Sequence, residues 1–470
     1  MTNIWKNRNV IECSIIIVAT LLVYYSVYSI PFLYYEIPGL KLNPIVQDMN
    51  LFFERMLTFK GMFQRPLSMF TYTLNYYFSG VDTFYYHVVN LVIHILNSLL
   101  VYFVAKRFLN KNYFFAAMLF ALHPLATACA SKLHGRFYSM GTLFMLLFLL
   151  LYFRWREKNT MDVKRIIILG VVFILMLLSK QSLIFLPVLV LWYEYFKGRV
   201  HFSAPFYITA GISLVIITLF TFVYAIPYSK TAIIGPGEFF LSQMGNLIVL
   251  IKFYFLPFQT ALVHDLYFYT GFDASVLFGL AVSIGLIYLA FRYRKKMFGF
   301  LLGAFLIAVF PTNSFMPKND IINEWRLYPT LVFFCILFVF VLNNLFNRRQ
   351  KLYYILFSCY LVTMSYSVIR QNNTYNDNVK IWKQVVAKYP DSSDSVNNLG
   401  RAYAINREFN MALESFLKAK QMDPTNYIYY RNLAQVYSDM GNMERASFYQ
   451  KETKKVGALY NSRSQSLLVK

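Results

Sequence analysis

Residues 31–84 read PFLYYEIPGLKLNPIVQDMNLFFERMLTFKGMFQRPLSMFTYTLNYYFSGVDTF and separate the first two hydrophobic segments of the chain. This stretch is polar by the standard of a mostly apolar sequence, and its charged residues include Glu36, Asp48 and Arg65. It is far longer than a turn between two membrane helices needs to be. A long loop on a rigid scaffold is where a membrane enzyme can place its chemistry.

The composition predicts a polytopic membrane protein. The chain is 58% hydrophobic and only 14% charged, whereas about a quarter of the residues in a soluble domain are charged. The net charge of +23 comes from Lys and Arg in short clusters between apolar runs, a pattern that argues against a nucleic-acid partner. The four cysteines lie in or beside apolar segments, so we expect core residues and not disulfides or metal ligands.

The apolar runs predict eleven membrane spans. They are about 11–30, 86–105, 113–130, the run ending at RWREK, 166–179, the run ending at FKGR, 205–227, 274–292, 297–312, 328–344 and 352–369. The run at 243–258 is expected to be re-entrant or interfacial. Every predicted cytoplasmic connection is basic, which places the N-terminus inside and both the 31–84 loop and the C-terminus outside the cytoplasm.

The composition changes at about residue 371, where a 34-residue period begins. The pairs that share this period are Leu399 and Leu433, Tyr403 and Tyr437, Ala412 and Ala446, Pro390 and Pro424, and Trp382 and Phe416. This is the tetratricopeptide period. The expected fold is therefore all-α, with a membrane domain over 1–370 and an extracytoplasmic tetratricopeptide solenoid of about two and a half repeats over 371–470.

Several polar residues stand where membrane depth makes them costly. Lys180, Arg136 and Arg326 lie at outer ends of three predicted spans, which suggests an anionic ligand such as a lipid phosphate. His87, Asn90 and His94 form one polar stripe, for which hydrogen bonding between helices is favoured over metal binding. We expect no metal site.

Nucleotide-binding loops and the common hydrolase motifs are absent from the sequence. A loop carboxylate with cations nearby suits a general base that deprotonates a hydroxyl while the cations stabilise a leaving phosphate. Glu36 is the predicted base, because Pro31 and Pro38 bracket it among aromatic residues. Asp48, in the same loop, is the second candidate. The other site candidates are Arg65, His87, His123, Asp265 and Glu324.

A set of motifs resembles one known family. In order, they are Asn43-Pro44, Arg65-Pro66-Leu67, Asn75, His87-x-x-Asn90-x-x-x-His94, Ala121-Leu-His-Pro124, Gly135-Arg136, Leu178-Ser-Lys-Gln181, Asp320 and Glu324-Trp-Arg-Leu-Tyr-Pro329. With the repeats, the chain resembles bacterial relatives of the transmembrane-and-tetratricopeptide-repeat O-mannosyltransferases, which have the GT-C glycosyltransferase fold.

The resemblance implies a polyprenyl-phosphate sugar donor, no further cofactor, and transfer on the extracytoplasmic face of a bacterial inner membrane. The family's first outer loop begins with two acids, at the positions of Tyr35 and Glu36 here, and its acid after Gly-Arg is replaced by Phe137 and Tyr138. This sequence therefore keeps one acid of the usual pair.

Three functions remain open at this point. The leading one is an inverting glycosyltransferase with Glu36 as base, with Arg136, Lys180 and Arg326 on the lipid-linked phosphate, and with repeats that hold a protein or peptide acceptor. The second is a non-catalytic, membrane-anchored scaffold for envelope or pilus assembly. The third is a ligase or transporter of lipid-linked glycans without a protein acceptor. A working base separates the first from the second, and acceptor chemistry separates the first from the third.

Overall fold

A computed structural model describes residues 2–33, 36–62, 64–198, 235–256, 269–310 and 322–467. Helices account for the regular secondary structure in these ranges, which contain no strand, so the all-α prediction is confirmed for them. The chain divides into two compact units, and the main part of the second begins at Thr374. The change in composition at about residue 371 thus falls just before this boundary.

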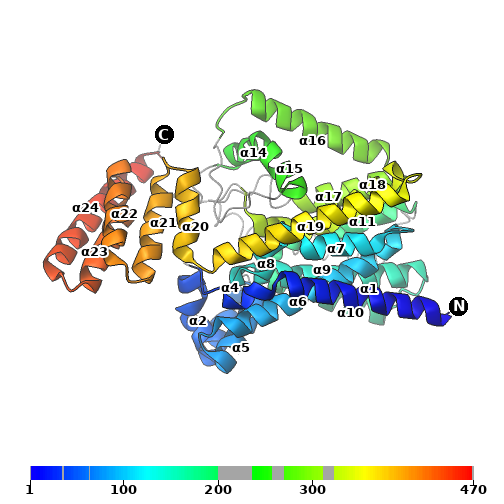
Figure 1. Ribbon diagram of the computed structural model, residues 1–470, viewed down its shortest axis with the longest axis horizontal. Coiled ribbons are helices and arrows are strands. Elements are labelled where there is room, and N and C mark those ends of the chain that lie inside the picture. Colours follow the sequence, from blue (N-terminus) through cyan, green and yellow to red (C-terminus); the bar gives the residue numbers. More distant parts are fainter. Residues whose placement is uncertain are drawn as a thin grey trace. The chain divides into compact units, whose positions relative to one another are not determined.

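The first unit is built around long helices that lie side by side in a bundle (Figure 1). They are α1 (Thr2–Val23), α6 (Thr83–Phe108), α9 (Arg136–Glu157), α10 (Val163–Ser179), α18 (Tyr328–Leu345) and α19 (Gln350–Tyr375). Shorter or outlying helices of the same unit include α7 (Tyr113–Leu122), α8 (Thr127–Ala130), α11 (Leu186–Phe196), α14 (Pro236–Gly245), α15 (Leu247–Phe255), α16 (Ala274–Arg292) and α17 (Met297–Val309).

Five described helices are long and apolar enough to cross a membrane, and six if one bent pair counts as a single span. Two shorter apolar helices, Gln181–Phe196 and Met297–Val309, accompany them. These helices mark the chain as a membrane protein. The described residues do not reach the eleven predicted spans, and the predicted span at 205–227 lies outside them.

The bent pair corrects the prediction of one straight span over 113–130. Helices Tyr113–Leu122 and Pro124–Ala130 meet at 53°. Pro124 lacks the N–H that a continuing helix needs. The His123 side chain instead accepts a hydrogen bond from the Leu125 N–H at 3.2 Å and caps the short turn that follows. The residues that follow the break, Pro124–Ala130, are all buried.

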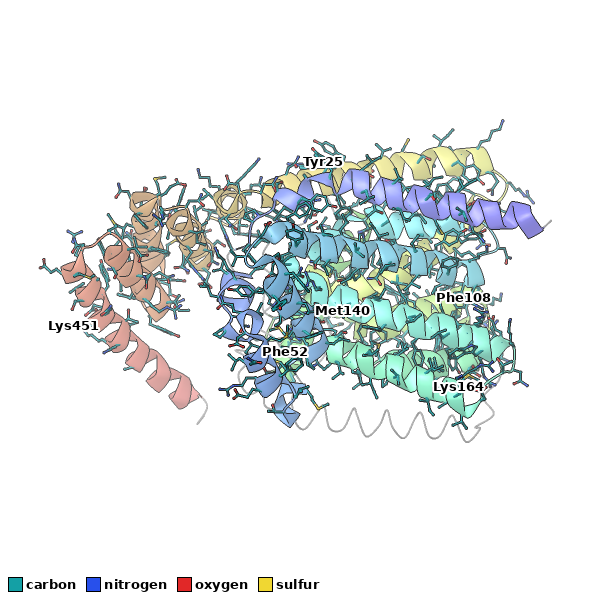
Figure 2. The ribbon with its side chains drawn as sticks, turned by 90° about the horizontal axis from the view of Figure 1, so that it is seen from below. Tyr25, Phe52, Phe108, Met140, Lys164 and Lys451 are labelled. Carbon is teal, nitrogen blue, oxygen red and sulfur yellow. The ribbon has the colours of Figure 1, made fainter. Side chains whose placement is uncertain are left out.

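The predicted 31–84 loop is folded into short helices. These are a π-helix (Ile37–Lys41), α2 (Pro44–Gln47), α3 (Met49–Met56), α4 (Phe59–Met62) and α5 (Pro66–Ser79). Asn43 and Asp48 cap α2 and α3 by accepting backbone N–H bonds, and prolines begin α2 and α5. Figure 2 places Phe52 of α3 at the opposite end of the bundle from Phe108 and Lys164, which flank two of the basic connections.

The second unit consists of α20 (Asn378–Lys388), α21 (Ser393–Ile405), α22 (Phe409–Met422), α23 (Tyr427–Asp439) and α24 (Met443–Leu467). Its core holds residues that the 34-residue period pairs: Trp382, Tyr403, Ala412, Phe416, Leu433, Tyr437 and Ala446. A Cβ atom on Gly400 would lie 2.8 Å from the Phe416 ring. Glycine at this position therefore lets α21 and α22 pack closely.

Candidate active site

Residues 131–136, SKLHGR, connect the bent helix pair to α9 and lie at the centre of the site. Although they are polar, Ser131, Lys132 and Arg136 are buried. Ser131 donates to Asn372 at 2.6 Å, and the Leu133 carbonyl accepts from the Tyr72 hydroxyl at 2.5 Å. Neighbouring residues of the segment thus meet different parts of the bundle.

Gly135 lets this segment pass close to the preceding helix. A Cβ atom there would lie 2.1 Å from the Ala128 carbonyl oxygen, which no side chain can accommodate without moving the backbone. The Tyr72 hydroxyl, which donates to this segment, remains protonated, because burial raises the pKa of Tyr72. Close backbone packing at Gly135 and the hydrogen bond from the Tyr72 hydroxyl thus hold the segment in place.

Glu36, the predicted base, is 1% exposed. Its Oε1 accepts a hydrogen bond from the His134 N–H at 3.1 Å, across nearly a hundred residues of sequence. The carboxylate that Pro31 and Pro38 bracket in the sequence is thus enclosed by the protein. A buried carboxylate held by a backbone donor is fixed in position, which general-base catalysis requires.

Asp48, the second candidate base, has a different role. It is exposed, and its Oδ1 accepts from the Asn50 N–H at 2.8 Å and the Leu51 N–H at 3.1 Å. These are the contacts of a helix N-cap. The structure therefore gives Asp48 a capping role at α3.

Two cations lie against the aromatic pair Phe137 and Tyr138 at the start of α9. The Lys180 Nζ lies 3.9 Å from the centre of the Tyr138 ring, and the Arg65 Cζ lies 4.8 Å from the centre of the Phe137 ring. Lys180 and Arg326 are 7% and 4% exposed. Lys180 and Arg65 thus place positive charge at the start of α9, and Arg326 is a further buried cation.

Arg136 does not share this arrangement. Its guanidinium is fully buried and stacks on Tyr72, with the Cζ atom 4.2 Å from the ring centre. It donates to Asn90 Oδ1 and Asn75 Oδ1, both at 2.6 Å, and to the Tyr86 carbonyl at 2.9 Å. These contacts join α5, α6 and α9. They favour a structural role for Arg136 over the predicted contact with a phosphate.

Glu324 forms an ion pair with Lys132, with 3.5 Å between Oε2 and Nζ and both side chains almost completely buried. The pair joins the 131–136 segment to the short helix Glu324–Leu327, which also carries Arg326. An ion pair of this depth fixes the two segments relative to each other, since separating it would leave a buried charge uncompensated.

The candidate histidines are bound within the helix bundle. His87 Nε2 lies 2.8 Å from the Ile30 carbonyl oxygen, and His123 Nε2 lies 3.0 Å from the Tyr254 carbonyl oxygen. His94 joins the Ala121 carbonyl to the Tyr328 hydroxyl. As the polar-stripe prediction favoured, these contacts link helices. The described residues contain no cluster that could hold a metal ion, and Asp265 lies outside them.

A cavity of about 290 Å³ lies between the 31–84 loop and the start of α9. It is lined by Gly39, Asn43, Ile45, Met56, Gln64, Arg65, Met69, His134 and Phe137. Arg65 adopts the left-handed conformation, with φ of 61°, and its Cζ lies 4.8 Å from the centre of the Phe137 ring. The cavity adjoins the backbone that holds Glu36, through His134.

Sequence reasoning did not select Tyr138, Phe137 or His134 as site residues. Tyr138 and Phe137 stand where the family places an acid, so their significance was noticed only as a departure from the motif. The signal that could have selected them is the run of polar residues and Gly135 directly before two aromatics, in a segment too short to leave the bundle.

The fold and site define a class: a helical membrane protein with a buried polar site beneath its first long loop and a helical repeat unit after its last apolar helix. A tetratricopeptide-repeat model matches residues 393–426. Human protein O-mannosyl-transferase TMTC3 is 22% identical over 443 residues, covering 81% of this chain and 47% of the relative. The chain is thus a relative of the TMTC O-mannosyltransferases.

Shorter matches are closer in sequence. Human protein O-mannosyl-transferase TMTC1 is 36% identical over 98 residues, or 20% of this chain and 11% of the relative. Caenorhabditis elegans protein O-mannosyl-transferase F38B6.6 is 36% identical over 100 residues, or 20% of this chain and 14% of the relative. The chain spans about half the length of the TMTC3 proteins that it matches. No solved structure matches it.

Proposed function

We propose that this chain is a membrane glycosyltransferase that moves a sugar from a polyprenyl-phosphate donor to a hydroxyl group of a protein or peptide. The observation that carries the proposal is the buried carboxylate of Glu36 on the His134 N–H, in the same 131–136 segment whose Lys132 pairs with Glu324, two residues before the buried Arg326. The relatedness to proteins named O-mannosyl-transferases supports it. The site needs no metal for this chemistry.

The proposed reaction assigns one task to each group. Glu36 accepts the proton of the acceptor hydroxyl as its oxygen attacks the anomeric carbon. The bond between that carbon and the phosphate oxygen breaks, and inversion follows from attack opposite the leaving group. The polyprenyl phosphate leaves as an anion, which the charges of Lys180 and Arg326 stabilise. Arg65, whose Cζ lies 4.8 Å from the ring of Phe137, the neighbour of Tyr138, adds to this positive field.

The proposal includes a GT-C-like membrane domain with eleven spans, in a bacterial inner membrane. The site lies on the extracytoplasmic face, and the repeats are on that side and hold the acceptor. The position of Phe52 opposite Phe108 and Lys164 supports this orientation (Figure 2). An alkaline-phosphatase fusion at the C-terminus should be active; fluorescence from a reporter that matures only in the cytoplasm would contradict it.

Glu36→Gln tests the mechanism. The amide keeps the size of the side chain but cannot take the proton, so transfer should fall about 10²- to 10⁴-fold while polyprenyl-phosphate binding is retained. The measurement is transfer of radiolabelled sugar from a synthetic polyprenyl-phosphate donor to a serine peptide by the purified chain. Transfer at the wild-type rate would show that Glu36 is not the base.

A membrane-anchored scaffold is the second candidate, favoured by the departures from the family motif at Tyr35 and Tyr138. It predicts that deleting the gene leaves the glycans of exported proteins unchanged, and that Glu36→Gln complements the deletion fully. A glycan loss that Glu36→Gln fails to restore would exclude it.

A further inference from the structure

Arg65 apart, the residues that line the cavity of about 290 Å³ between the 31–84 loop and α9 have no task in the reaction described above. Resting on the proposed function, we infer that it binds one apolar side chain of the acceptor peptide, next to the residue whose hydroxyl receives the sugar. The cavity would then select acceptors by sequence.

The size of the cavity suits a single side chain. The cavity lies at or below the lower limit of about 300 Å³ for sites that bind drug-sized ligands. A polyprenyl chain of many isoprene units is too large for it, whereas a phenyl or isobutyl group fits.

The walls combine apolar and polar groups, as a peptide residue with an apolar side chain requires. Met56, Met69 and Phe137 belong to the buried core of the loop and present thioether and phenyl surfaces. The Asn43 amide already donates to the Gly39 carbonyl at 3.1 Å and accepts from the Ile45 N–H at 3.0 Å. A hexose would bring several hydroxyl groups to these surfaces, and each one left without a partner is unfavourable.

The position of the cavity points to the acceptor. Gly39 and His134 both line it, and the His134 N–H holds the Glu36 carboxylate. A Cβ atom on Gly39 would lie 3.2 Å from the His134 ring, so the two walls already touch at this point. A peptide whose side chain enters this cavity therefore lies against the segment that holds Glu36.

Arg65 provides the polar rim. A non-glycine residue in the left-handed conformation is strained, and such residues gather at ligand sites. The conformation directs the guanidinium over Phe137, at the wall of the cavity. There, together with the exposed Gln64, it can donate hydrogen bonds to the carbonyl groups of a bound peptide while the apolar side chain enters beneath.

The test measures peptide binding to the full-length chain in detergent without any donor. Fluorescent serine peptides are compared in pairs. The two members of a pair differ only at one residue next to the serine, which is phenylalanine in one and alanine in the other. One pair varies the residue before the serine and a second pair the residue after it. Burial of the phenyl group should make one phenylalanine peptide bind about 10- to 100-fold more tightly than its alanine counterpart. Ile45→Trp fills the cavity, and Gln64→Trp covers its mouth from an exposed position where folding is not at risk.

Both substitutions should reduce the ratio of the two peptide affinities to about one. The matched control is Leu57→Trp, in the same loop but outside the cavity, where the side chain is 69% exposed. This control should retain the preference for the phenylalanine peptide. Equal binding of the two peptides by the wild type, or a preference that survives both cavity substitutions, would overturn the inference. The inference would also be overturned if the two cavity substitutions weakened binding of a sugar-phosphate lipid but left the peptide preference unchanged. The cavity would then hold the sugar of the donor. Absence of sugar transfer with the preference intact would instead refute the proposed function alone.

Discussion

Replacing Arg136 separates a structural role from a phosphate-binding role. Arg136→Met removes a fully buried guanidinium whose donors meet Asn90, Asn75 and the Tyr86 carbonyl. Each buried oxygen left without its donor costs about 1–3 kcal/mol. Methionine keeps apolar contact with Tyr72, and the charge no longer has to be buried, so the net loss of stability should be about 3–5 kcal/mol.

The assay is the unfolding midpoint of the purified chain in mixed micelles. Arg136→Lys should be intermediate, because an ammonium group can restore only part of the forked contact. Arg55→Met is the matched control: this side chain is 64% exposed, and its loss should change the unfolding free energy by less than about 0.5 kcal/mol. If Arg136→Met unfolds like the wild type but no longer binds polyprenyl phosphate, the structural role is wrong and Arg136 is a phosphate ligand.

Three shorter predictions concern other residues. Asp48→Asn keeps an N-capping side chain and should leave sugar transfer and stability unchanged, whereas Asp48→Ala should lower the unfolding free energy by about 1 kcal/mol in a denaturant titration. Lys180→Gln should weaken polyprenyl-phosphate binding about 10- to 100-fold by calorimetry, and unchanged affinity would exclude Lys180 from the phosphate site. Gly400→Ala places a methyl group 2.8 Å from the Phe416 ring and should cost about 1–3 kcal/mol in thermal unfolding of the full chain; Gly457→Ala, whose nearest neighbour would be 3.7 Å away, should cause no loss.

The parts of the fold that repeat or that are uniformly apolar could be predicted from the sequence. The 34-residue period places Tyr403 and Tyr437 in the core because each repeat buries the same face. The apolar run at 274–292 becomes α16 with those same bounds. In both cases the deciding forces act within a helix or between neighbouring helices, so they leave a local pattern.

The site could be predicted only in part, because its contacts join distant residues. The sequence shows Arg136 as a cation at a helix end, but not the oxygens of α5 and α6 that surround it. It shows Asp48 as an acid in a loop, but the N–H groups it caps appear only once α3 is formed. The burial of Glu36 and Lys180 appears only in the structure, and their catalytic roles stay predictions.

The 131–136 segment explains why the base and the cations would keep a fixed geometry. The His134 N–H holds Glu36, and Lys132 holds Glu324, two residues before Arg326. Polar groups this deep in a membrane domain are unfavourable unless they are paired, so the pairing itself resists displacement of either side. Gly135 follows directly with no space for a side chain, so any movement of the segment would shift the carboxylate and the ion pair together. A transferase that must align a hydroxyl, an anomeric carbon and a leaving phosphate in one line benefits from this arrangement, because the alignment is established before the substrates bind.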